Sequence, residues 1–142
     1  MRTIFLLAIG IGFGFSVPAT GAEFFSTFDP APMTMATRDS VAGTGSVTAD
    51  LQGSKLTVQG SFSGLASVAT KAQLRSGSMT GVPGEPFADL TVSQTDAGTL
   101  TGSVTLNRAQ QKALLAGAIY VQIDSAKAPD GTLRAWLLRR QP

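Results

Sequence analysis

The sequence contains no cysteine and no histidine, and only 14% of its residues carry a charge. Without cysteine the chain can form neither disulfides nor thiolate nucleophiles. Without histidine it has no Ser-His-Asp triad and no imidazole ligand for a metal ion. Its formal net charge of +2 over 142 residues leaves no strongly basic stripe for nucleic acid. We therefore expect a protein that is not an enzyme, holds no cofactor and does not bind nucleic acid.

The start of the chain has the layout of a secretory signal peptide. Arg2 supplies the positive charge, residues 4–17 form an almost purely apolar run, and small residues precede a cleavage site after Ala22. The apolar run is shorter than the ~20 residues that a helix needs to cross a bilayer. The sequence therefore predicts a signal peptide over residues 1–22, export to the periplasm or the medium, and one domain over residues 23–142. No membrane span is expected after cleavage.

The rest of the chain alternates apolar and polar residues with period two. Between residues 55 and 62, for example, Leu56 and Val58 alternate with Thr57 and Gln59. This pattern is typical of half-buried antiparallel strands. The predicted strands cover residues 23–28, 45–51, 55–62, 68–75, 87–92, 99–106, 118–125 and 132–138. We predict an all-β fold, an antiparallel β-sandwich or partly closed barrel of about eight strands.

One short helix is expected between the strands, at about residues 107–116. Asn107 is a favourable N-cap, and Gln110 stands three residues further on, at the spacing of a capping box. Gly117 is suited to end the helix in the left-handed conformation.

Several motifs follow one another in a fixed order. They are Gly43-Thr44-Gly45, Phe62-Ser63-Gly64-Leu65, Thr105-Leu106 with Ala109-Gln110 and Leu114-Leu115-Ala116-Gly117, Tyr120-Val121-Gln122-Ile123-Asp124-Ser125, and Pro129-Asp130-Gly131-Thr132-Leu133-Arg134. As an ordered set they resemble a CHRD domain, the module repeated in chordin and found singly in many bacterial exported proteins. The resemblance covers residues 24–138 and implies an exported module.

The chain departs from this family at its histidines. The resemblance aligns family histidines with Gln73, Arg75 and Asp124. In the family, three imidazoles gathered there could form a metal or proton site. Here an amide, a cation and an anion replace them, so an activity that depends on these histidines is not expected.

The replaced positions and one neighbour form our candidate site, the polar cluster of Gln73, Arg75, Gln122 and Asp124. Strand alternation places Gln73 with Arg75 on one face and Gln122 with Asp124 on one face. We expect Arg75 and Asp124 to form an ion pair on neighbouring strands, with the two glutamines alongside. The alternative is that all four are ordinary solvated strand residues that make no contact.

Two aromatic residues alternate away from the predicted core. Tyr120 and Trp136 fall on the face opposite the apolar residues of their strands. We expect them to pack across a second layer, and the alternative is a platform on which a ligand stacks.

Three classes of function fit the sequence. We favour an exported, non-enzymatic binding or structural module whose partner is an unknown protein or cell-surface component. The first alternative is a metal-binding protein or metalloenzyme, which the lack of histidine and cysteine disfavours. The second is a small-ligand carrier that uses the interior of the sandwich, which a filled core would exclude.

Overall fold

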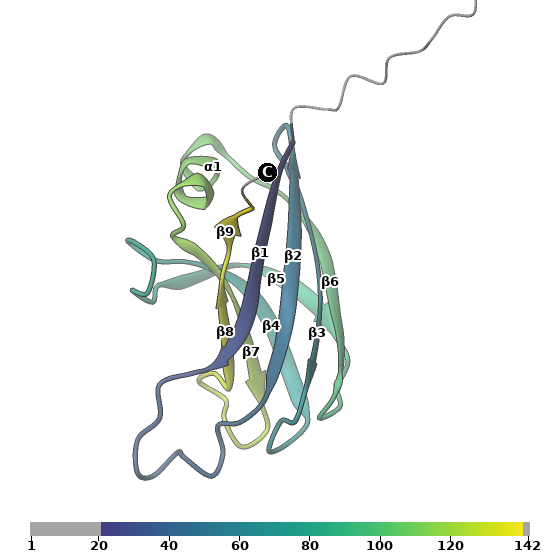
Figure 1. The fold of residues 1–142 in the computed structure, drawn as a ribbon, viewed down its shortest axis with the longest axis vertical. Coiled ribbons are helices and arrows are strands. Elements are labelled where there is room, and N and C mark those ends of the chain that lie inside the picture. The colour runs from purple at the N-terminus through teal and green to yellow at the C-terminus, as the bar shows by residue number, and fades with distance from the viewer. Residues whose placement is uncertain (1–20, 141–142) are drawn as a thin grey trace, which may run out of the picture.

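The structure, a computed structural model, describes residues 21–140 (Figure 1). In this range the chain forms nine strands and one helix. They follow one another in the order predicted from the alternating segments of the sequence. They are β1 (Gly21–Pro30), β2 (Thr44–Gln52), β3 (Lys55–Ser63), β4 (Ala69–Ser76), β5 (Glu85–Val92), β6 (Gly98–Thr105), α1 (Arg108–Leu115), β7 (Ile119–Ser125), β8 (Leu133–Trp136) and β9 (Leu138–Arg139).

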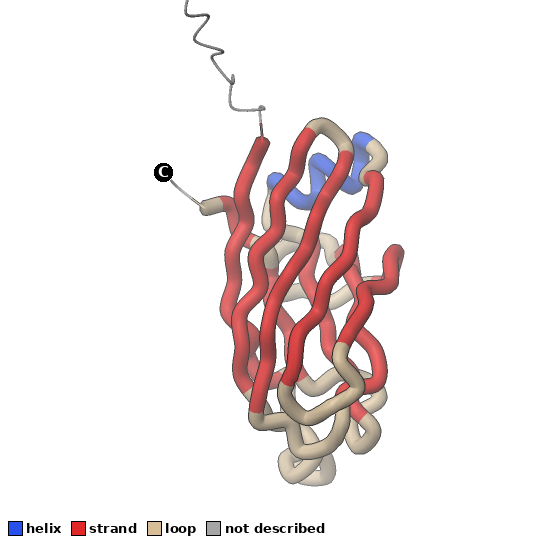
Figure 2. Tube along the Cα trace, turned by 90° about the vertical axis from the view of Figure 1, so that its right-hand side faces the viewer, coloured by secondary structure: helices blue, strands red, loops and turns tan. Residues whose placement is uncertain are grey.

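The strands close into an antiparallel barrel, which confirms the predicted all-β class. The order around the barrel is β2-β3-β6-β5-β4-β7-β8-β1, and β1 also pairs with β2. Two seams are short: β5 and β6 share only the pairs Thr91↔Thr101 and Val92↔Leu100, and β1 meets β8 only through Asp29 and Pro30. The barrel therefore consists of two walls joined at narrow corners, and Figure 2 shows one wall with its long strands side by side.

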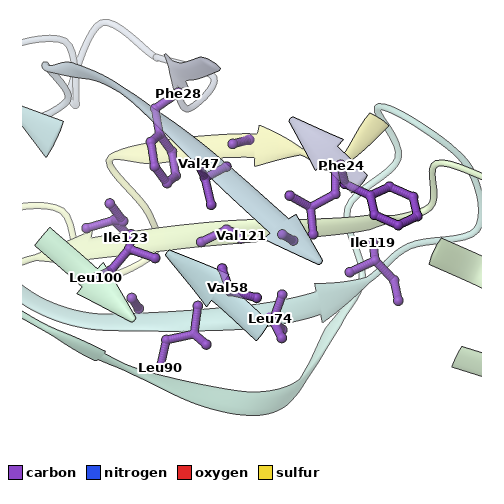
Figure 3. Close-up of a cluster of buried hydrophobic side chains, with 14 of the residues drawn as sticks. Phe24, Phe28, Val47, Val58, Leu74, Leu90, Leu100, Ile119, Val121 and Ile123 are labelled. Atoms are coloured by element: carbon purple, nitrogen blue, oxygen red, sulfur yellow. The ribbon is translucent and has the colours of Figure 1, made fainter. Parts of the chain in front are cut away.

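The interior of the barrel is filled by side chains. Figure 3 shows residues from β1 to β7 converging on one cluster, with Val58 of β3 and Val121 of β7 near its middle. Both of these valines are almost fully buried. These buried side chains occupy the interior, which argues against a ligand carrier that uses the interior.

The predicted helix is present at one end of the barrel, against β7 and β9 (Figure 1). Both bonds of the capping box form. The backbone N–H of Gln110 donates to Oδ1 of Asn107 at 2.8 Å, and the backbone N–H of Asn107 donates to Oε1 of Gln110 at 2.9 Å. Gly117 then adopts φ +75°, which ends the helix. Leu114 anchors the helix in the core.

Some predicted boundaries were wrong. The last strand, predicted over residues 132–138, is split into β8 and β9 at the buried Leu137. Pairing with β7 ends there, because β8 pairs with both β7 and β1 whereas β9 pairs with β1 alone. The segment predicted as a loop between Ser76 and Pro86 instead forms a hairpin closed by a bridge between Met79 and Val82, and β5 begins at Glu85.

The predicted signal peptide lies almost wholly outside the described residues. Gly21 and Ala22 are its two exceptions: they begin β1 and pair with Gln52 and Leu51. Cleavage after Ala22 would remove these two pairs and leave the remaining pairing of β1 with β2 in place. Within residues 21–140, no helix is long and apolar enough to cross a membrane.

Candidate functional site

The four residues of the polar cluster lie on the outer face of one barrel wall. β4 and β7 are adjacent and antiparallel, and Gln73 stands directly opposite Gln122 in their register. On β4, the two residues that flank Gln73, Ala72 and Leu74, point into the core. The cluster nevertheless divides into two hydrogen-bonded groups, one partly exposed and one buried.

The partly exposed group links β4 to β5 and to the hairpin that precedes β5. Nε2 of Gln73 donates to Oδ1 of Asp89 at 3.1 Å, and its Oε1 accepts a bond from Nη1 of Arg75 at 3.4 Å. Nε of Arg75 donates to the Gly84 carbonyl at 3.1 Å. Arg75 therefore fixes one end of the hairpin.

The buried group links β7 to β8 and to the turn between them. Nε2 of Gln122 donates to Oδ1 of Asp124 at 2.8 Å and to the Asp130 carbonyl at 3.3 Å. Its Oε1 accepts a bond from Nε of Arg134 at 3.0 Å. Gly131 makes room for this amide, since a Cβ there would lie 3.0 Å from it. The side-chain amide of Gln122 is almost fully buried, and these bonds satisfy both its oxygen and its nitrogen, as burial requires.

The predicted ion pair between Arg75 and Asp124 does not form. Within residues 21–140 the one ion pair joins Arg38 and Asp39, at 3.6 Å. The register explains the difference, because Arg75 stands opposite Tyr120 whereas Asp124 stands opposite Lys71. Four residues along a strand span about 13 Å. The two side chains share a face but lie too far apart along it for contact.

Tyr120 and Trp136 pack against each other on the same face. They are direct cross-strand neighbours, with ring centroids 4.3 Å apart and planes tilted by 33°. The Tyr120 hydroxyl accepts a bond from the Gly84 N–H at 3.0 Å and donates to the Gly84 carbonyl at 3.1 Å. The expected second layer is therefore the hairpin at residues 77–84. It covers Tyr120 completely and leaves Trp136 half-buried.

Comparison with protein families decides what kind of domain this is. The sequence model of the CHRD domain matches residues 15–137. The chain belongs to the CHRD domain family. The match begins within the predicted signal peptide and ends one residue before the predicted end of the resemblance. Neither the curated proteins nor the solved structures give a match.

The polar cluster of this CHRD domain does not suit a transition metal. Zinc and copper prefer imidazole and thiolate ligands, and the chain has no histidine or cysteine. Positions 73, 75 and 124 hold an amide, a guanidinium and a carboxylate. Residues 21–140 contain no group of three or more side chains that could ligate a metal ion.

Sequence reasoning missed four partners of the cluster in this CHRD domain. They are the side chains of Arg134 and Asp89 and the backbone carbonyls of Gly84 and Asp130. Alternation alone places Arg134 on the same side of its strand as Trp136. No pattern in the sequence indicates that the hairpin folds back onto Tyr120.

We expect weak energetic coupling between Arg75 and Asp124. A double-mutant cycle with Arg75→Ala and Asp124→Ala should give a coupling energy below ~0.5 kcal/mol, because side chains without contact usually behave additively. The same cycle on the hydrogen-bonded pair Gln122 and Arg134 should give about 0.5–3 kcal/mol. Urea unfolding of the variants measures both. A coupling above about 1 kcal/mol for Arg75 and Asp124 would show that they interact directly.

Asp124 makes the stability of the domain depend on pH. Burial raises the pKa of the Asp124 carboxyl, and the bond from Gln122 together with the charges of Arg75 and Lys71 only partly offsets this. Because the folded-state pKa is the higher one, the stabilising contribution is complete below the unfolded pKa of about 3.9. It is lost as the pH rises through the folded pKa.

The variant Asp124→Asn should remove this pH-dependent loss of stability while keeping an oxygen that accepts the bond from Gln122. Its free energy of unfolding, relative to the wild type, should increase between about pH 3 and pH 7. Urea titrations across this range measure the difference, and the exposed Asp96→Asn serves as the control. A difference that stays constant or falls with rising pH contradicts the assignment.

Proposed function

We propose that this CHRD domain is exported, loses residues 1–22, and acts in the periplasm or the medium as a non-enzymatic module that binds a protein at the cell surface. The positive start, the apolar run over residues 4–17 and the small residues before Ala22 support export. The lack of histidine and cysteine removes the commonest general base and the strongest nucleophile, which supports a binding role.

The hairpin at residues 77–84 is the observation that carries the proposal. It projects from the barrel wall (teal in Figure 1) and presents Met79 and Val82, whose side chains are 61% and 41% exposed. Trp136 and Arg75 lie at its base. Methionine, arginine and aromatic residues are enriched in protein–protein interfaces.

The hairpin is also held rigidly, which lowers the entropy cost of binding. Three hydrogen bonds from Arg75 and Tyr120 converge on the Gly84 backbone. At the other end, the Gly77 N–H donates to the Ala118 carbonyl at 2.8 Å. The hydroxyl of Thr80 reaches across to the Gly117 carbonyl at 2.7 Å. The polar cluster contributes to this surface by positioning the hairpin through Arg75.

Capture from the cell envelope tests the binding role. The exported protein and a Met79→Ser/Val82→Ser variant are used as baits on solubilised envelope proteins. Met35→Ser is the matched control, since Met35 is 84% exposed on a different loop. A protein captured by the wild type and by Met35→Ser, but lost with the hairpin variant, supports the proposal. Equal capture by all three baits, or no specific capture, refutes it.

Export is tested separately by the N-terminus of the protein outside the cytoplasm. Mass spectrometry of the periplasmic and medium fractions should find a chain that begins at Glu23. A full-length chain retained in the cytoplasm refutes the export half of the proposal and leaves the binding half to its own test.

A further inference from the structure

We infer that a pocket at the end of the barrel opposite the helix binds a small organic carboxylate with an apolar body. This inference concerns a different place from the hairpin and goes beyond the proposed protein partner. The pocket has a volume of about 260 Å³ and lies between the loop after β1 and the turn between β7 and β8. Its apolar lining comes from Ala31, Pro32, Val41, Ala128 and Pro129, and its charged lining from Lys127, Asp130 and Arg134.

The walls of the pocket are fixed by hydrogen bonds through one residue. The Thr132 carbonyl accepts a bond from the Ala31 N–H at 2.9 Å. The Thr132 hydroxyl donates to the Ala42 carbonyl at 3.1 Å and accepts from the Ala42 N–H at 3.3 Å. Thr132 itself is fully buried. The loop is thereby tied to the turn at both of its ends, so the pocket is preformed, as most small-molecule sites are.

The floor of the pocket is apolar. Ala31, Val41 and Ala128 form a small buried cluster separate from the main core. This cluster gives the pocket a surface that favours hydrocarbon over water. The volume is below the ~300 Å³ at which sites for drug-sized molecules begin. The ligand body is therefore small, on the scale of one ring or a short aliphatic chain.

Arg134 supplies a positioned cation. Its Nε is engaged by Gln122, which is itself held by Asp124 and the Asp130 backbone. The guanidinium carbon also lies 5.9 Å from the centre of the Tyr120 ring. With Nε engaged, the two terminal nitrogens remain, and this pair matches the two oxygens of a carboxylate. The buried half of the polar cluster thus orients Arg134.

The charge of the lining selects a monoanion. Lys127 and Arg134 together outweigh Asp130 by one positive charge. A single carboxylate balances this excess, whereas a doubly charged phosphate would be repelled by Asp130. The apolar floor further favours a ligand whose other end is hydrocarbon.

Benzoate and its neutral counterpart benzamide are the probes. The exported protein, labelled with ¹⁵N, is titrated with each while its amide resonances are followed. We expect saturable binding of benzoate, with shifts at Lys127, Ala128 and Gly131, and binding of benzamide at least about tenfold weaker. Arg134→Gln and Lys127→Gln should each weaken benzoate binding, Arg134→Gln by about tenfold or more.

Arg38→Gln is the matched control, because it removes the same charge from the loop after β1, which forms one wall, without lining the pocket. It should bind benzoate like the wild type, and so should Met79→Ser/Val82→Ser. Equal binding of the two probes, unchanged affinity in both pocket variants, or no saturation by benzoate would overturn the inference. None of these results bears on envelope capture through the hairpin, so the two proposals fail independently.

Discussion

Replacing Val58 by Asp should severely destabilise the protein and strongly lower its midpoint of urea unfolding. Val58 is 1% exposed in the middle of β3 and pairs with Ala49 and Gly102 on the neighbouring strands. An aspartate there places a carboxylate among apolar side chains with no cation to pair with. The cost is roughly 3–5 kcal/mol after relaxation, against a total stability of about 5–15 kcal/mol for a typical domain.

The adjacent residue provides the control for this substitution. Gln59→Asp introduces the same carboxylate one position further along β3, where the side chain is exposed. Its midpoint of urea unfolding should change little, because surface substitutions usually stay within about 0.5 kcal/mol. Similar midpoints for the two variants would mean that the core face of β3 is wrongly assigned.

Replacing Tyr120 by Ala should be the second most damaging change. Tyr120 is fully buried on the outer face, between Trp136 and the hairpin at residues 77–84. Removing a buried aromatic ring costs about 3–5 kcal/mol. The same change removes two of the three hydrogen bonds that fix Gly84. We expect a large loss of stability together with faster amide exchange throughout the hairpin.

Tyr120→Phe separates the hydroxyl from the ring. It keeps the contact with Trp136 but leaves both polar atoms of Gly84 without the tyrosine oxygen, at a cost of about 1–3 kcal/mol. Hydrogen exchange measured by mass spectrometry should then show deprotection confined to residues 77–84. Unchanged exchange in this segment, with either variant, would contradict the role assigned to Tyr120.

Local structure was largely predictable because its causes are local. Alternation identified the strands, and the side chains of Asn107 and Gln110 cap the helix with residues that lie three apart in the sequence. The break at Leu137 was not predictable in this way. Alternation continues through it, and the division lies in the pairing, because β8 pairs with both β7 and β1 whereas β9 pairs with β1 alone.

Closure of the barrel also left little trace in the sequence. The seams that distinguish a barrel from a sandwich are two residue pairs between β5 and β6 and two between β1 and β8. Backbone pairing over so short a length demands no special side chains. The sequence therefore predicted the two architectures equally well.

For the polar cluster, strand alternation predicted which face the residues share but not the register between the strands. Parity along β4 and β7 correctly placed Gln73, Arg75, Gln122 and Asp124 on one outer face. Their contacts depend on register, and an irregularity in β4 between Ala69 and Lys71 accompanies the pairing of Lys71 with Asp124. The predicted ion pair failed because this register sets Arg75 opposite Tyr120, four residues along β7 from Asp124.

The three residues that the resemblance aligns with family histidines belong to two different hydrogen-bonded groups. Gln73 and Arg75 belong to the group that fixes the hairpin, whereas Asp124 belongs to the group that orients Arg134 beside the pocket. The wall that links them is built from β4, β7 and β8. This wall thus supports both proposed sites, and the chain has no histidine that could act there as an acid or base.

Site-specific photo-crosslinking in the exporting cell tests the central proposal, a hairpin that binds a cell-surface protein. A benzophenone side chain is introduced in place of Met79 in one strain and in place of the more exposed Met35 in another. We predict that irradiation gives a discrete crosslinked protein from position 79 and none from position 35. No adduct at position 79, or the same adduct from both positions, would contradict the account.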